Sequence, residues 1–256
     1  KVATAWGVKK FFWAAFDAPP DTDANLLAAF SSLADKGVVG FGGFAEVSME
    51  TAGAIEKIPQ GWCISARIAR NPVEIHPMRT ITDENIDPLP DVVALLPQDA
   101  VSGDGYHDEG RVPGLNAARF CSLMSLPGVE GFYVAAAQTF AASNSNFKNL
   151  PHLRIILKVA RVYYRWGLSQ LARRVPKDLQ TGYIRPSIAD SIESDAEKVI
   201  KDALGGAIEG VRVLVNRADD LKNDPTLRSK IRVVVGEYIL VMDSDIGISQ
   251  TLPAAA

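Results

Sequence analysis

The residues with most potential for catalysis or metal binding are few and widely separated. His107, Asp108 and Glu109 stand next to one another, a combination that could form a metal site or an acid–base pair. Adjacent side chains on a loop diverge, however, and no second cluster of ligands supports them. We therefore interpret the three residues as a solvated polar turn and expect no bound metal ion.

A thiol nucleophile is a second possibility, since Cys121 could act together with a distant histidine. Nothing in the sequence around Cys121 is of a kind that lowers a thiol pKa. Cys63, the other cysteine, lies too far away for a metal-type spacing. We expect both cysteines to be buried apolar residues. His76, next to Pro77, and His152, after Pro151, have ordinary structural positions.

Motifs that bind cofactors or activate nucleophiles are absent from the sequence. It has no G-x-S-x-G, Walker A, G-x-G-x-x-G or H-E-x-x-H pattern. The glycine-rich run at residues 40–43 lacks the third glycine and the helix start that a phosphate site needs. We interpret it as a flexible turn or a close backbone contact. We predict no cofactor and no enzymatic activity.

A row of basic residues is the clearest surface signal. We call it the basic ridge: Arg154, Lys158, Arg161 and Arg165. Their spacing of i, i+4, i+7 and i+11 places them along one side of a helix, without a compensating acid. Such a row is often only a solvated face. In a protein with a net charge of −3 it is also a candidate surface for an acidic partner.

The composition is that of an ordinary globular protein. Of 256 residues, 47% are hydrophobic and 22% charged, which argues against disorder, a coiled coil or a collagen-like chain. The slightly negative net charge argues against a strongly basic nucleic-acid-binding protein, so we expect no nucleic-acid partner. No apolar run is long enough for a membrane span.

The elements that must position these residues fall into two groups. The first predicts a small α/β domain over residues 1–110, with strands at 8–16, 38–44 and 91–96 and helices at 25–36, 49–58 and 62–70. The polar, turn-rich stretch at residues 98–114 is the expected boundary.

The second group predicts an α+β domain over residues 111–256 with two long helices. The helix after Pro151, to residue 174, would pack through an apolar face that includes Leu153, Ile156, Leu157, Ala160, Tyr164, Leu168 and Leu171. The helix at 186–204 would use a stripe of Ile188, Ile192, Ala196, Val199 and Ala203, and strands follow at 211–215, 231–235 and 238–242. The predicted fold class is therefore α/β and α+β.

Several segments of this second half resemble bacteriophage contractile-tail sheath proteins. Residues 111–120 read RVPGLNAARF, followed by a Pro-Gly turn at 127–128 and Gly-Phe-Tyr-Val at 131–134. The long helix at 151–174 and the ending TLRSKIRVVVGEYI at 226–239 occupy the places that corresponding segments have in that family. The order and spacing of these segments carry the resemblance.

The resemblance implies a structural subunit that self-assembles as stacked rings or a helix around a tail tube. It implies a homo-oligomer in a virion tail, of a phage or a phage-like contractile injection system, assembled in the host cytoplasm. In such an assembly we expect the basic ridge to face the tube. We expect the final strands to join a neighbouring subunit's sheet through Ile231, Val233, Val235, Tyr238, Val241, Ile246 and Ile248.

Two alternatives remain open from the sequence. A non-contractile tail or baseplate protein would share the same segments. A small-molecule enzyme with an α/β domain would instead show a concave pocket with clustered titratable groups.

Overall fold

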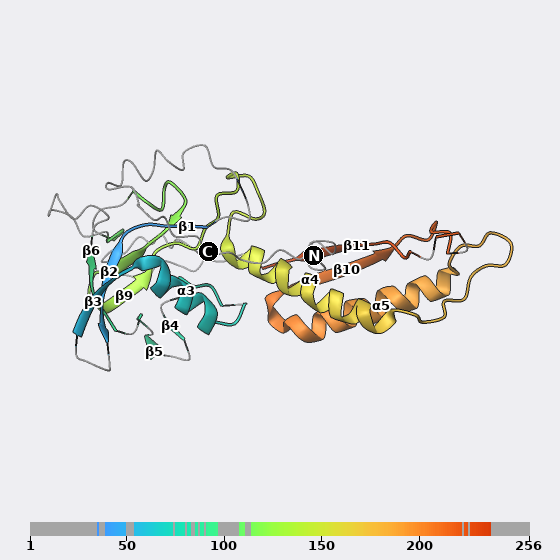
Figure 1. Cartoon of the computed structure of the whole chain (residues 1–256), viewed down its shortest axis with the longest axis horizontal. Helices are drawn as coiled ribbons and strands as arrows, with labels where there is room; N and C mark the ends of the chain where they lie inside the picture. Colours follow the sequence, from blue (N-terminus) through green and yellow to red (C-terminus); the bar gives the residue numbers. More distant parts are fainter. Residues whose placement is uncertain are drawn as a thin grey trace, which may run out of the picture.

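The computed structural model describes residues 35, 39–49, 54–73, 75–79, 81–82, 85–86, 88–89, 91–96, 108–110, 114–221, 223–224 and 226–236. The molecule is elongated, and two parts follow each other end to end along its long axis (Figure 1). We call the described residues 39–149 the lobe and residues 150–236 the arm. The lobe holds several small sheets and a helix, and the arm pairs two helices with a β-hairpin, so the predicted α/β and α+β fold class is correct.

The main sheet of the lobe has three antiparallel strands in the order β3-β2-β6. They are β2 (Phe44–Met49), β3 (Ala54–Pro59) and β6 (Val92–Leu96). The strand predicted at 91–96 is confirmed, whereas the helix predicted at 49–58 is wrong. Ile55 and Ile58 have helical spacing, but β3 pairs with β2 along its whole length, from Phe44–Pro59 to Met49–Ala54. Cross-strand pairing overrides the helix preference of Ala, Glu and Lys here.

Shorter strands complete the lobe. β1 (Gly40–Phe41) pairs in parallel with β7 (Phe120–Cys121), and β8 (Leu123–Leu126) forms a hairpin with β9 (Val129–Val134). A Cβ atom on Gly40 would lie 2.6 Å from the ring of Phe140. The glycine-rich run therefore makes a close backbone contact, one of the two interpretations that the sequence allowed. The two-residue strands β4 (Ile81–Thr82) and β5 (Asn85–Ile86) also pair.

The helix α3 (Gln60–Arg70) covers the sheet and confirms the helix predicted at 62–70. Its buried Gln60 links two strands, because its side chain accepts from the Leu123 N–H at 3.0 Å and donates to the Phe44 carbonyl at 3.3 Å. The surrounding core contains Ala45, Ile64, Leu95, Cys121, Leu123 and Val134. Described residues on both sides of the predicted 110/111 boundary thus share one core, and the division into two domains stays a prediction.

The arm is a two-layer sandwich in which helices pack on one face of a β-hairpin (Figure 1). The helices are α4 (Leu150–Gln170) and α5 (Pro186–Leu204), which ends in the short 3₁₀ helix Gly205–Ala207. The strands are β10 (Gly210–Val215) and β11 (Ser229–Val234). Ile155, Val159, Ala196, Ile200 and Val213 form the buried centre. The predicted helix at 186–204 and the strands at 211–215 and 231–235 are confirmed to within a residue or two.

The buried face of α4 agrees with the predicted one only near its start, where Leu153 is buried and Leu157 packs against the same cluster. Ile155 and Val159 face the core, with Val162, Tyr163 and Trp166 packed against it. Leu168 and Leu171, which we expected to hold the helix in place, are 45% and 60% exposed. Apolar residues lie around most of the circumference of α4, so the sequence alone could not select the stripe that α5 and the hairpin cover. The buried stripe of α5 keeps Ile192 and Ala196 from the prediction, and its other members are Ala189, Ile200 and Leu204.

The predicted elements at residues 8–16, 25–36 and 238–242 lie outside the described residues. Among the helices that the structure describes, none has the length and apolar character needed to cross a membrane.

Candidate assembly surfaces

The polar residues considered for catalysis organise turns in the lobe. Asp108 is buried, and its carboxylate accepts from the N–H groups of Gly110 and Ser125 at 2.9 and 2.8 Å and bonds the Ser125 hydroxyl. The carboxylate of Glu109 accepts from three successive N–H groups at residues 114–116. Both side chains serve the local backbone, and Asp108 is not the solvated residue that we expected. His107 lies outside the described residues.

The thiol of Cys121 is fully buried, as expected, in the core of the lobe. Burial raises its pKa to about 12, and the sulfur exchanges hydrogen bonds with the backbone of Gln138. Cys63 is only half-buried, in contrast to our expectation, and this partial burial raises the pKa of its thiol. Neither is a reactive thiolate at neutral pH. Within the described part of the chain, no group of three or more His, Cys, Asp or Glu side chains could hold a metal ion.

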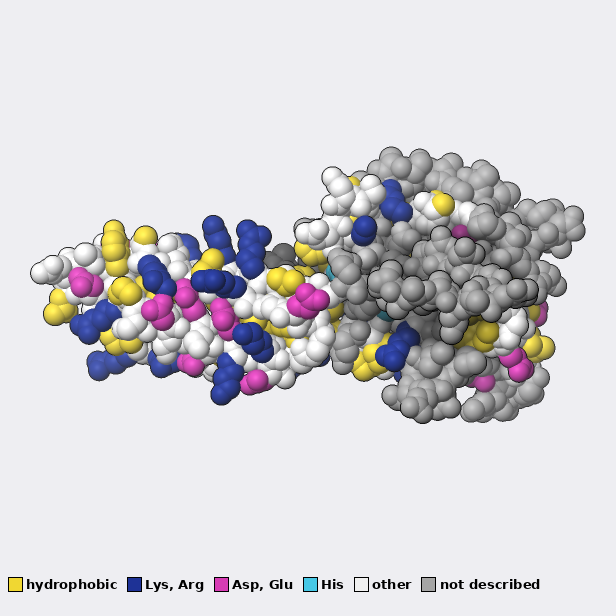
Figure 2. Space-filling model, turned by 180° about the vertical axis from the view of Figure 1, so that it is seen from behind, with side chains coloured by type: hydrophobic (Ala, Val, Ile, Leu, Met, Phe, Trp, Pro, Cys, Tyr) yellow, Lys and Arg dark blue, Asp and Glu magenta, His cyan; other side chains and the backbone are white. Residues whose placement is uncertain are grey.

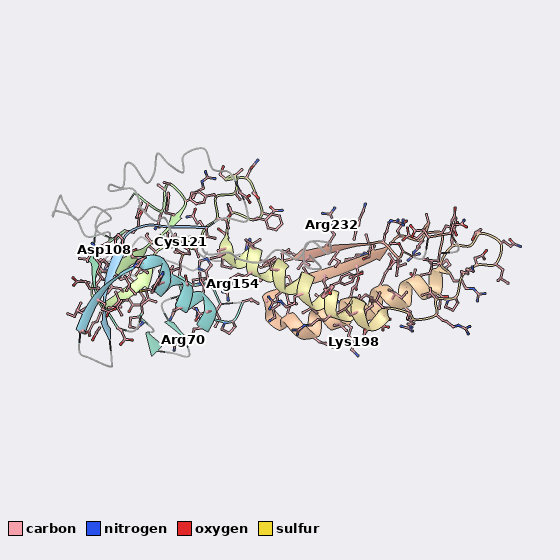
Figure 3. All side chains as sticks on the ribbon, viewed as in Figure 1. Arg70, Asp108, Cys121, Arg154, Lys198 and Arg232 are labelled. Carbon is pink, nitrogen blue, oxygen red and sulfur yellow. The ribbon has the colours of Figure 1, made fainter. Side chains whose placement is uncertain are left out.

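The basic ridge lies along α4, beside the buried stripe. Arg161 and Arg165 are exposed and Lys158 is half-buried. Arg154 is different, because it lies where the arm meets the lobe (Figure 3). Its Nη2 donates to the carbonyls of Ile68 and Asn71 at 2.8 and 2.7 Å. These carbonyls belong to the last turn of α3 and its C-cap, where a helix lacks internal donors and favours a cation.

The hairpin of the arm has one covered and one exposed face. Ile231, Val233 and Val235 point toward the helices and pack against the arm core. On the other face lie Leu214 and Val234, together with the exposed basic residues Arg212, Lys230 and Arg232. Arg232 and Lys198 of α5 lie on opposite sides of the arm (Figure 3). Of the predicted inter-subunit residues, Tyr238, Val241, Ile246 and Ile248 lie outside the described residues.

Arg212 and Arg232 stand directly opposite each other in the hairpin. Like charges in such a cross-strand pair destabilise a sheet. The arm thus carries an unfavourable pair on an exposed face, an arrangement that an acidic contact would relieve.

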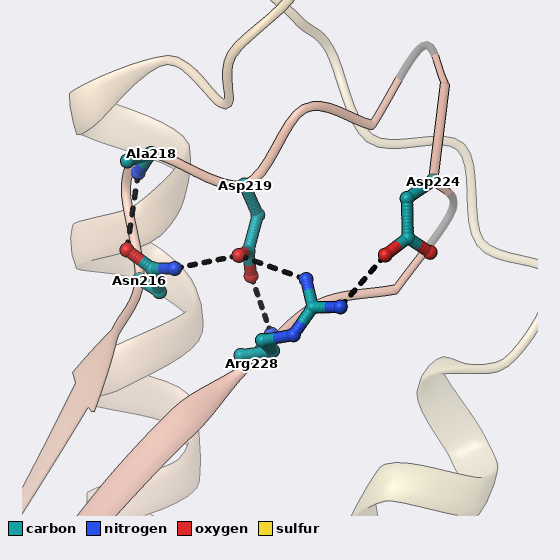
Figure 4. Close-up of polar contacts among 5 residues, drawn as sticks. All are labelled: Asn216, Ala218, Asp219, Asp224 and Arg228. Carbon is teal, nitrogen blue, oxygen red and sulfur yellow. Dashed lines mark hydrogen bonds and ion pairs between the residues drawn. The ribbon is translucent and has the colours of Figure 1, made fainter.

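A polar network ties the loop between β10 and β11 (Figure 4). The buried carboxylate of Asp219 accepts from the Arg228 N–H at 2.6 Å and forms an ion pair with the Arg228 guanidinium at 3.2 Å. The same guanidinium reaches Asp224 at 2.7 Å, and Asn216 donates to Asp219 at 2.6 Å. These contacts hold the two ends of the loop together and keep the hairpin in register.

Apolar side chains are exposed at the end of the arm farthest from the lobe (Figure 2). Leu179 is 89% exposed in the turn between α4 and α5, and Leu171 and Tyr183 are also exposed. The turn is well ordered by hydrogen bonds, since the Asp178 carboxylate accepts from the N–H groups of Gln180 and Thr181.

The fold has counterparts among solved structures. The sheath complex of an extracellular contractile injection system, PVC, in its contracted state, matches 91% of this chain with a TM-score of 0.58 and 10% identity. The baseplate of the anti-feeding prophage matches 85% with a TM-score of 0.56 and 11% identity, and the contracted helical sheath of that prophage matches 86% with a TM-score of 0.50 and 12% identity.

The chain has a contractile-sheath-like fold. The likeness covers both the lobe and the arm, since it extends over 85–91% of the chain. The sequence itself matches no protein-family profile, and no curated protein matches it significantly. At identities of 10–12%, the structural likeness establishes the fold.

The chain spans 56–62% of the length of these sheath and baseplate chains. The remaining part of those longer proteins is not matched by the residues of this chain. The assembly and partners of this chain are therefore matters for proposal.

One pair of polar residues in the sheath-like fold was not predicted from the sequence. Glu193 and Glu197 of α5 accept hydrogen bonds from the backbone of β10. Their i, i+4 spacing, just beside the apolar stripe of α5, was visible in the sequence. Nothing in the sequence indicated that they face the edge of a strand.

Proposed function

We propose that the chain is a structural subunit of a contractile sheath, from a phage tail or a phage-like injection system. It would assemble with copies of itself as stacked rings or a helix around a tube, in the host cytoplasm, and remain in the tail. The single observation that carries this proposal is the sheath-like fold, which extends over lobe and arm together. No enzymatic step is part of the proposed role.

The contact with the tube is assigned to the basic ridge. Exposed ion pairs are individually weak and screened by salt. A row of them can nevertheless fix the position of the chain on the tube and still allow the two to separate. Arg161 and Arg165 are exposed and suited to acidic tube residues, with Lys158 beside them. Arg154 already donates two hydrogen bonds to the lobe, so we expect the smallest tube contribution from it.

The contact between subunits is assigned to the end of the chain. An extended segment that adds to a neighbour's sheet satisfies backbone groups on both sides. Ile231, Val233 and Val235 anchor β11 to the arm core. Tyr238, Val241, Ile246 and Ile248 follow β11 in the sequence and would form the added strand.

Electron microscopy of the purified protein tests the proposal. Long hollow tubes or stacked rings support a sheath subunit, whereas monodisperse particles under all salt and pH conditions, with or without tube protein, contradict it. The baseplate likeness favours one second candidate, a baseplate component. Discrete rings that do not stack, even with tube protein present, would favour that role.

The ridge is tested by the double reversal Lys158→Glu with Arg161→Glu. Assembly on tubes should weaken while the thermal unfolding midpoint changes little. The matched control is Lys198→Glu with Lys201→Glu, which makes the same charge change on exposed positions of α5. Equal assembly by both double variants would contradict the ridge assignment.

A further inference from the structure

The hairpin of the arm has two edges, and α5 covers only one of them. The Val213 N–H on β10 donates to Oε1 of Glu197 at 2.9 Å, and the Val215 N–H donates to Oε1 of Glu193 at 2.8 Å. Hydrogen bonds from N–H groups to carboxylates are among the stronger ones in proteins. Side chains thus occupy positions that a third strand would need.

The strand register explains why these two N–H groups point outward. Asn216 N–H donates to the Arg228 carbonyl across the hairpin, so this pair and every second pair after it carry the bonds between the strands. The residues between them, Val211, Val213 and Val215, direct their N–H and carbonyl groups to the outer edge of β10.

The spacing of α5 matches that edge. Residues i and i+4 of a helix lie about 6 Å apart along its axis, and residues i and i+2 of a strand about 6.6 Å apart. Glu193 and Glu197 therefore meet Val215 and Val213 in order. Arg217 continues the row, since its guanidinium bonds Asp190 and lies 3.5 Å from Glu193.

The outer edge of β11 lacks such a cover among the described residues. Within that part of the chain, no hydrogen bond joins the outward backbone groups of Ile231 and Val233 to another residue. The neighbouring residues Lys230 and Arg232 are exposed. The two edges of one small sheet thus differ in a property that decides whether a strand can be added.

We infer that Glu193 and Glu197 close the β10 edge, so that an extended segment from a second copy of this chain can add only beside β11. This inference rests on the proposed strand exchange between subunits and adds its direction. One open edge makes the contact heterologous, so that each copy receives a strand at a single place. Two open edges would let sheets grow in both directions and mix assembly geometries.

The test combines hydrogen exchange with peptide binding on the full chain. The probe is a synthetic peptide with the sequence of residues 229–236, which already pairs with β10 on the inner side of the hairpin. In the variant Glu193→Ala with Glu197→Ala, the Val213 and Val215 amides should exchange on the order of tenfold faster. The variant should also bind one more peptide per chain than the wild type, and the added peptide should restore protection of these two amides.

The matched control is Glu193→Gln with Glu197→Gln, because the amide oxygen still accepts a hydrogen bond. It should exchange and bind as the wild type does. If the double alanine variant unfolds, Glu197→Ala alone leaves Glu193 and Arg217 in place and should expose only the Val213 amide.

The outcomes separate this inference from the proposed function. If the wild type binds no peptide and the alanine variant binds one, Glu193 and Glu197 do close the β10 edge. The same result would contradict the addition of a strand beside β11. If the alanine variant binds no more peptide than the wild type, or the wild type binds at both edges, the closure is refuted.

Discussion

The aromatic core of the lobe and the outer sheet face of the arm use apolar residues in opposite ways. In the lobe, Phe120 and Phe140 are 1% exposed and meet edge to face, with ring centroids 5.2 Å apart. In the arm, one layer of helices covers one face of a two-stranded sheet, and Leu214 and Val234 remain exposed on the other face. A two-stranded hairpin is marginal without such packing.

This difference suggests that the buried residues of the lobe stabilise the fold, whereas the exposed surfaces of the arm contact partners. The lobe has sheets stacked around a closed core, so its residues mainly hold the fold. The arm extends from it with an exposed basic sheet face, the exposed residues Arg161 and Arg165 of the basic ridge, and an apolar tip. Substitutions should therefore divide in the same way: large losses of stability in the lobe, and small ones on the outer surfaces of the arm.

The largest effect is expected in the lobe core. Phe140→Ala should lower the free energy of unfolding by about 3–5 kcal/mol, because it leaves a cavity beside Phe120 and Gly40. Leu214→Ala, on the outer face of the arm, should change it by less than about 0.5 kcal/mol. Urea denaturation measures both. Equal losses would remove the distinction between the two parts.

A smaller effect is expected where the parts meet. Arg154→Met keeps the aliphatic stem but removes both donors to the end of α3, at a cost of about 2–3 kcal/mol. The arm should also vary more in its angle to the lobe, which small-angle X-ray scattering would detect as a broader distance distribution. Arg165→Met, at an exposed position of the same helix, is the control. An unchanged scattering profile for Arg154→Met would argue against a joint at this residue.

Acid should weaken the lobe near the joint. Burial, assisted by the nearby His152, lowers the pKa of His76 from 6.5 to about 4. The unfolded chain then binds more protons than the native one between these values, so stability falls as pH drops from 6.5 toward 4 and is steady above 6.5.

The comparison with a non-titrating variant isolates this contribution. His76→Asn can still accept the Met78 N–H, which now donates to His76 Nδ1 at 3.1 Å. Urea midpoints measured at pH 7, 5.5 and 4.5 should fall less steeply for the variant than for the wild type. Parallel curves would mean that His76 protonation does not contribute.

The smallest effect has the opposite sign. Arg232→Glu replaces a like-charge pair with Arg212 by an opposite-charge pair and should stabilise the isolated chain by about 0.2–1 kcal/mol. Lys230→Glu is the control, because Lys230 faces Leu214 across the hairpin. If the outer face contacts an acidic partner, Arg232→Glu should weaken assembly despite the gain. A loss of stability in Arg232→Glu would contradict the interpretation that Arg212 and Arg232 repel each other.

Local sequence signals were enough for much of the arm. Pro186 at the start and Gly205 after the end bound α5. Alternation of basic and apolar residues from Lys230 to Val233 sets the two faces of β11. The basic ridge could also be found, since its four residues repeat at helical spacing. Each of these features depends on residues that are close together in the chain.

The remaining features depend on partners far away in the sequence. β3 became a strand because β2 lies beside it, and the buried stripe of α4 was selected by α5 and the hairpin. Arg154 joined lobe and arm because α3 ends 84 residues earlier in the chain, at Arg70, within reach of its guanidinium. Glu193 and Glu197 meet β10 only because α5 packs along that edge. Periodicity tells which residues share a face, but only packing tells what that face meets.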